Sequence, residues 1–148
     1  MKTYRPARVL LAEVQQLLAP KPAPGAAPLE QVADLLCRGR QYSWVGIYLA
    51  AGSKPDSKVL RASRSPHPAQ MARPETKSKV LISMKLSGRE YGVLDVESER
   101  ENAFGWEDRV LLENVANLLA RFLAGPGKYL ARHARELSPE AVKAAGAR

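Results

Sequence analysis

The strongest candidates for chemistry in this chain of 148 residues are two carboxylates, Asp95 and Glu97. They lie in the apolar run "YGVLDVES", which is typical of a β-strand. Alternate side chains of a strand project from the same face, so we expect both carboxylates on one face of a sheet. Such a pair can work as an acid and a base, or it can attract a cation such as an ammonium group.

A second strand, "YSWVGIYLA" at residues 42–50, alternates between two kinds of side chain. One face is plainly aliphatic and suits a core, whereas the other carries Trp44, Gly46 and Tyr48. Two aromatic rings on either side of a glycine are typical of a concave binding floor. Rings that simply pack beneath a loop give the same pattern, and the sequence leaves both interpretations open.

The hairpin that carries the carboxylates has two possible registers. A two-residue turn at Ser87 and Gly88 would place the carboxylates beside the apolar side chains of the preceding strand. A three-residue turn, Leu86 to Gly88, shifts the pairing by one residue and separates an apolar face from a polar face. We therefore predict the three-residue turn, which brings Lys79 opposite Asp95.

Cysteine and histidine contribute little. Cys37 is the only cysteine, which excludes an intrachain disulfide and a thiolate-rich zinc site. The pattern places it in the last turn of a helix, where it is interpreted as a small buried apolar residue. His67 and His133 are far apart in the sequence, so we predict no metal site, no cofactor and no catalytic residue.

The remaining elements are predicted from apolar spacing and end signals. Helices are expected over residues 5–18, from Pro28 to about residue 39, and in the segment 102–125, with a short strand over residues 58–63. This order of elements predicts an α+β fold. We expect a single domain over residues 1–125 and a basic, partly helical tail over residues 126–148.

The net charge of +8 is concentrated in a proline-rich loop region and in the tail. Such clusters could contact nucleic acid, but they lack interleaved aromatic residues and a nucleic-acid motif, so a solvated surface is the better interpretation. No apolar run is long enough to span a membrane, and the N-terminal segment does not have the pattern of a signal peptide. The expected location is therefore the cytoplasm.

Three segments together resemble the GAF domain family, and most closely its branch of free methionine-R-sulfoxide reductases. They are the helices leading into "WVGIYLA", the hairpin "GREYGVLDVES" and the segment "NAFGWEDRVLLENVANLLARFL". The resemblance implies an antiparallel sheet of five or six strands, with terminal helices on one face and a small-molecule pocket on the other. It also implies a dimer that forms through those helices.

The same resemblance assigns roles to individual residues. Trp44 and Tyr48 match pocket aromatics of the reductase branch, and Asp95 and Glu97 match its acidic pair. The sequence departs from the branch at Lys79, where an acidic residue is expected, and its middle region is too short to form the full lid. A reductase also needs a thiolate and a resolving thiol, whereas Cys37 is predicted on the opposite side of the sheet.

The function predicted from the sequence is that of a non-catalytic sensor or regulatory module in signal transduction. It would bind a small amino-acid-like or cationic ligand through Trp44, Tyr48, Lys79, Asp95 and Glu97, form a homodimer, and act on an output protein. Three alternatives stay open: a salt bridge between Lys79 and Asp95 that leaves no ligand site, a residual reductase that uses Cys37, and a nucleic-acid-binding protein.

Overall fold

The computed structural model describes residues 5–19, 27–52, 57–65 and 76–137, and the structural statements below concern these residues. They contain an antiparallel sheet with the strand order β2-β1-β4-β3. The strands are β1 (Trp44–Ala50), β2 (Lys58–Arg64), β3 (Ser78–Leu86) and β4 (Arg89–Ser98). The described part thus has four strands, where the resemblance implied five or six.

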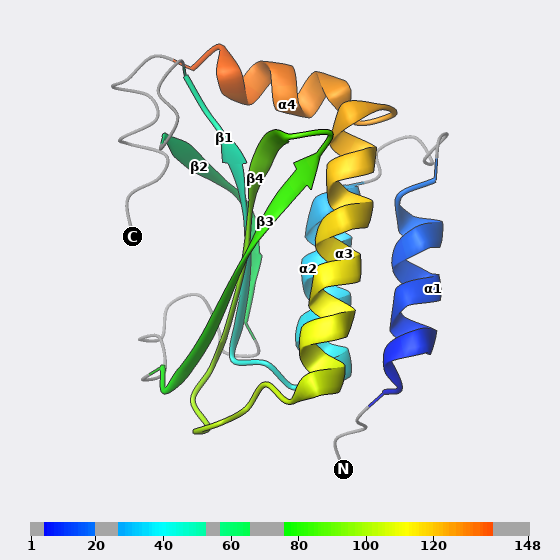
Figure 1. Cartoon of the computed structure of the whole chain (residues 1–148), viewed down its shortest axis with the longest axis vertical. Helices are drawn as coiled ribbons and strands as arrows, with labels where there is room; N and C mark the ends of the chain where they lie inside the picture. The colour runs from blue at the N-terminus through cyan, green and yellow to red at the C-terminus, as the bar shows by residue number, and fades with distance from the viewer. Residues whose placement is uncertain (1–4, 20–26, 53–56, 66–75, 138–148) are drawn as a thin grey trace.

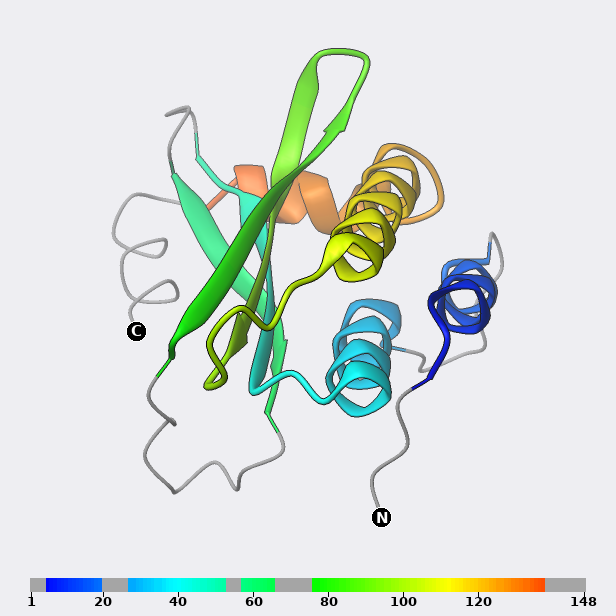
Figure 2. The same cartoon turned by 60° about the horizontal axis from the view of Figure 1, so that its bottom comes forward.

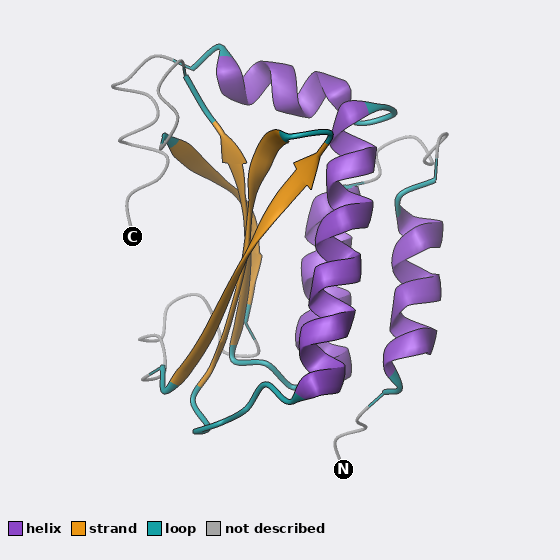
Figure 3. Ribbon diagram, in the orientation of Figure 1, coloured by secondary structure: helices purple, strands orange, loops and turns teal. Residues whose placement is uncertain are grey.

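Three helices lie on one face of this sheet, and a fourth lies across one end of it (Figures 1 and 3). They are α1 (Ala7–Leu17), α2 (Pro28–Arg40), α3 (Trp106–Ala124) and α4 (Lys128–Arg135). Helix α2 packs on β1 and β2, and α3 packs on β3 and β4, while α1 lies outside both of them (Figure 2). The predicted α+β class is confirmed. None of the described helices is long and apolar enough to cross a membrane.

The positions of the helices follow from end signals in the sequence. Helix α2 begins at Pro28, a residue suited to the first turn, and ends where Gln41 adopts a left-handed conformation with φ of 60°. Helix α3 begins after Gly105, whose N–H donates to Asp108 Oδ2 at 3.3 Å, and two acidic residues lie in its first turn.

The core lies between the sheet and α2 and α3, and it continues between these two helices and α1. Its fully buried side chains include those of Leu10, Val14, Leu36, Val45, Ile47, Leu49, Leu94, Val96, Val115 and Leu119. The aliphatic face predicted for β1 is therefore the core face. Because side chains alternate along a strand, the other face of β1 and β4 points away from the helices.

The hairpin between β3 and β4 differs from the prediction. Its turn has two residues, Ser87 and Gly88, both with positive φ, so the predicted three-residue turn is wrong. A β-bulge next to Met84 then shifts the register by one residue, which restores the separation of apolar and polar faces. As a result Lys79 pairs with Glu97 and not with Asp95.

Helix α4 lies across one end of the sheet and contacts α3 and β1 (Figure 1). Its Ala131 and Ala134 side chains are buried in the same core as the rest of the chain. The described part of the predicted tail therefore packs on the body of the protein. The end of the tail, residues 138–148, and His67 lie outside the described residues, and the domain limits stay a prediction.

Candidate functional site

The five residues predicted for the site come from three neighbouring strands and meet on the sheet face that points away from α2 and α3. Trp44 and Tyr48 lie on β1, Lys79 on β3, and Asp95 and Glu97 on β4. Trp44 and Lys79 flank Glu97 on its two sides, since both pair with it in the sheet. We refer to these five residues as the carboxylate face.

Both carboxylates are almost completely buried, with 1% of the surface of each residue exposed. Thr76 Oγ1 donates a hydrogen bond to Glu97 Oε1 at 2.8 Å. Lys79 Nζ lies 3.6 Å from Glu97 Oε2 and 3.8 Å from Asp95 Oδ2, so one ammonium group faces both acids. These distances exceed those of direct hydrogen bonds, and the Lys79 side chain is 46% exposed, so the ion pairs are loose.

Burial determines the protonation of Asp95. It raises the pKa of this carboxyl from 3.8 to about 6, because the charged form loses its hydration, and the attraction of Lys79 opposes the shift only in part. Asp95 therefore changes charge in mildly acidic solution, and a cation placed against it would favour the charged form.

The aromatic residues are arranged differently from the expected pair of rings around a gap. A Cβ atom added to Gly46 would lie 2.0 Å from the Trp44 ring, which means that the six-membered ring of the indole lies against the glycine. The ring centroids of Trp44 and Tyr48 are 6.4 Å apart. The space above Gly46 is thus filled by Trp44, which is buried, while Tyr48 is half-buried.

Cys37 lies on the other side of the sheet from the carboxylate face. It is in the last turn of α2, as predicted, and is 4% exposed. Its Sγ donates to the Tyr42 carbonyl oxygen at 3.2 Å. No group of three or more histidine, cysteine and acidic residues that could hold a metal ion occurs within the described ranges.

Thr76 is a site residue that sequence reasoning missed. It precedes β3, and its hydroxyl reaches Glu97 only because the chain enters the strand beside the end of β4, where the Lys77 N–H donates to the Ser98 carbonyl oxygen at 2.8 Å. No periodic pattern marks such a residue, so the sequence offers no signal for it.

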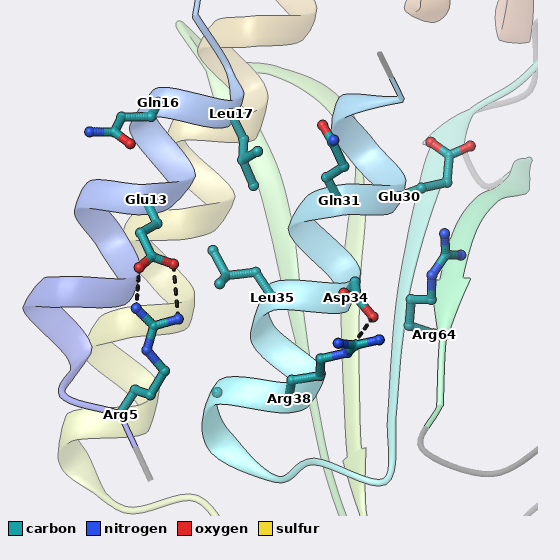
Figure 4. A pocket seen from close by; sticks show the side chains of 11 residues that line it. Arg5, Glu13, Gln16, Leu17, Glu30, Gln31, Asp34, Leu35, Arg38 and Arg64 are labelled. Carbon is teal, nitrogen blue, oxygen red and sulfur yellow. Dashed lines mark hydrogen bonds and ion pairs between the residues drawn. The ribbon is translucent and has the colours of Figure 1, made fainter. Parts of the chain in front are cut away.

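A groove of about 920 Å³ lies between α1 and α2 on the helical side (Figure 4). Its charged side chains largely neutralise one another, since Arg5 pairs with Glu13 and Arg38 with Asp34. Leu17 contributes apolar surface. The described residues of the groove therefore present no concentrated charge or reactive group, and the groove is a weaker candidate than the carboxylate face.

Comparison with solved structures identifies the fold. The chain resembles free methionine-R-sulfoxide reductase from Neisseria meningitidis in complex with its substrate, with a TM-score of 0.65 and 20% identity over 83% of this chain and 91% of that one. The substrate complex of the Staphylococcus aureus reductase gives a TM-score of 0.65 and 17% identity over 83% of this chain and 99% of that one. The GAF domain of Acinetobacter phosphoenolpyruvate-protein phosphotransferase gives 0.65 and 12% identity over 86% and 97%. The chain therefore has a GAF-like fold.

Sequence comparison adds no further identification, because neither a family model nor a curated protein matches the chain. The structural neighbours include both enzymes and GAF domains, and at these identities they define the fold alone.

Proposed function

We propose that this protein is a non-catalytic GAF-like sensor or regulatory module that binds a small cationic or amino-acid-like ligand at the carboxylate face. The observation that carries the proposal is the pair of buried carboxylates, Asp95 and Glu97, which lie on one face of β4 and which Lys79 approaches only loosely. Buried carboxylates on one face favour a cation that approaches them more closely than Lys79 does.

The geometry favours an ammonium group as the ligand's anchor. The ammonium of Lys79 sits 3.6 to 3.8 Å from the acids on a side chain that is nearly half exposed, so a ligand amine can displace it at small cost. Lys79 then acts as a competitor for the site. The ring of Tyr48, half-buried beside Trp44, adds an aromatic edge for the rest of the ligand.

The position of the cysteine supports a non-catalytic role. Reduction of a sulfoxide by a thiol requires an accessible thiolate next to the substrate. Cys37 is buried on the helix side of the sheet and donates its S–H to the Tyr42 carbonyl oxygen, which suits a structural residue. A residual reductase is the alternative function, because similar solved structures are reductases. Methionine R-sulfoxide is therefore included among the ligands to be tested.

The proposal extends to a homodimer that forms through the terminal helices and to an output protein. Helix α1 covers the outer side of α3, so the apolar stripe of α3 is largely used within one chain. The exposed side of α1 is therefore the terminal surface that a second copy would contact.

Isothermal titration with a panel of amino acids and amines, including methionine and its R-sulfoxide, tests the ligand site. We expect saturable heat that is lost in Asp95→Asn and that weakens below about pH 6, because protonated Asp95 no longer attracts the amine. Lys79→Met removes the competing ammonium, so it should tighten binding by about tenfold. Lys85→Met, at the exposed other end of β3, is the matched control and should leave affinity unchanged.

Two results would overturn the proposal. An absence of binding heat across the panel, for both the wild type and Lys79→Met, would mean that the carboxylate face holds no ligand of this kind. Reduction of methionine sulfoxide that disappears in Cys37→Ser would establish the enzyme instead. Light scattering on the same samples measures the molar mass in solution. The mass of a monomer at micromolar concentration would contradict the proposed homodimer.

A further inference from the structure

A second groove, of about 360 Å³, lies at the end of the sheet that α4 covers. It is bordered by the start of β4, the last residues of α3 and one side of α4 (Figure 1). The residues that line it are Arg89, Tyr91, Leu123, Ala124, Lys128, Ala131, Arg132, Arg135 and Glu136. Four of these side chains are cations and one is a carboxylate, so we refer to the groove as the basic groove.

The sequence of α4 explains why cations gather there. Lys128, Arg132 and Arg135 are spaced by four and three residues, which places them on one side of the helix. Ala131 and Ala134 are buried in the core and fix the rotation of α4. The basic side of the helix is therefore held towards the groove.

The described residues that line the basic groove carry an excess of positive charge, because Glu136 is the one carboxylate among four cations. Within the described part of the chain, no carboxylate lies within 4.0 Å of the charged groups of Arg89, Lys128, Arg132 or Arg135. The carbonyl end of α3 also borders the groove, but its partial charge of about half a unit offsets only a small part of four full charges. A concave site with this charge attracts anions.

Two of the arginines are held in place by other contacts. The Arg89 guanidinium lies over the Tyr91 ring, 4.8 Å from its centroid. Arg135 Nη2 donates to the Glu90 carbonyl oxygen at 3.3 Å. Because both side chains are already ordered, a ligand loses less free energy in immobilising them.

We propose that the basic groove binds a small phosphate-bearing molecule with at least two negative charges. Arginine forks match the oxygens of phosphate groups in pairs, and the volume is in the range of small-molecule sites. Tyr91 and the exposed Ala124 provide apolar surface for the part of the ligand that carries no charge.

The basic groove is separate from the carboxylate face. Asp95 lies six residues further along β4 than Arg89, which corresponds to about 20 Å along an extended strand. The two sites have opposite charge, so a ligand suited to one is repelled by the other. A small anion and a small cation would thus be sensed at different places on the same sheet.

Titration of the full chain with inorganic pyrophosphate, followed by calorimetry, tests the basic groove. We expect saturable binding of one pyrophosphate per chain, weakened about 100-fold in the double variant Lys128→Gln, Arg132→Gln, since each charge-assisted contact contributes about tenfold. The control, Lys77→Gln with Arg109→Gln, removes one lysine and one arginine elsewhere on the surface and should retain the affinity within about threefold. All four side chains are exposed, so both variants should fold.

Comparison of two ligands then identifies the source of the phosphate. A nucleoside diphosphate that binds more tightly than pyrophosphate indicates that the apolar surface takes part, and equal affinities indicate a site for the phosphates alone; either supports the proposal. Equal weakening in the groove variant and in the control would overturn it, because the attraction would then come from the net charge of the whole chain. Oligonucleotide binding would also overturn the proposal if its affinity increases with the length of the oligonucleotide and pyrophosphate does not compete with it.

Discussion

Substitution of Asp108 by asparagine is expected to destabilise the protein strongly, because this carboxylate neutralises a buried arginine. Asp108 Oδ1 accepts hydrogen bonds from Arg40 Nε at 3.2 Å, from Arg40 Nη2 at 3.1 Å and from the Tyr42 hydroxyl at 2.6 Å. Arg40 is 1% exposed and Asp108 5%. Burial, together with the bond to Asp108, raises the pKa of the Tyr42 hydroxyl, which keeps the proton that it donates.

The magnitude follows from the burial of both charges. Removal of one partner from a buried ion pair costs about 3–5 kcal/mol, because the other charge is left without compensation. Arg40 retains its hydrogen bond to the Arg5 carbonyl oxygen at 2.7 Å and its ion pair with Glu107 at 2.9 Å, so we expect the lower end, about 3 kcal/mol. In a domain of this size that corresponds to a fall in Tm of about 10 °C.

Urea and thermal unfolding followed by circular dichroism measure this loss. Glu107→Gln is the matched control, since it removes a charge from the same helix turn and from the same arginine. The Glu107 side chain is 63% exposed, so its pair should contribute less than about 1 kcal/mol. If Asp108→Asn costs no more than Glu107→Gln, the reasoning about burial is refuted.

Two further predictions concern the carboxylate face. The pKa of Asp95 is about 6 in the folded protein and 3.8 ordinarily, so between these pH values the folded state holds a proton that the unfolded state has released. The contribution of this proton to the free energy of unfolding is complete below about pH 4 and is lost as the pH rises through 6. Asp95→Asn should therefore remove up to about 3 kcal/mol of decline in stability between pH 4 and pH 6, and a variant with the wild-type slope would contradict this. Gly46→Ala should displace the Trp44 ring, which now lies 2.0 Å from the position of the added methyl group, and shift its fluorescence to longer wavelength when measured in a Trp106→Phe background. An unchanged spectrum would mean that Trp44 does not lie over Gly46.

Most of the fold could be predicted from the sequence, because its elements have local signals. The apolar spacing of the helices, Pro28 at the start of α2 and the alternation along β1 depend only on neighbours in the chain. The prediction of a three-residue turn is wrong because a two-residue turn combined with a β-bulge separates the apolar and polar faces of the hairpin equally well. The alternation of side chains indicates which face of the sheet a residue lies on, but not which residue of the neighbouring strand it pairs with.

The carboxylate face was partly predictable for the same reason. Alternation places Asp95 and Glu97 on one face, but it does not reveal that both are buried or that Thr76 reaches Glu97. The loose approach of Lys79 to both acids also depends on the observed register. These features arise from segments that are distant in the sequence, so no local pattern encodes them.

The sequence by itself determined the α+β class, the order of the elements and the two faces of the central strands, because the periods of a helix and of a strand are local properties. Only the tertiary structure decided which charges are compensated. Burial of Asp95, the packing of Trp44 over Gly46 and the gathering of cations around α4 each depend on what packs nearby. The free energy of a charge is determined by its surroundings, and these exist only once the chain has folded.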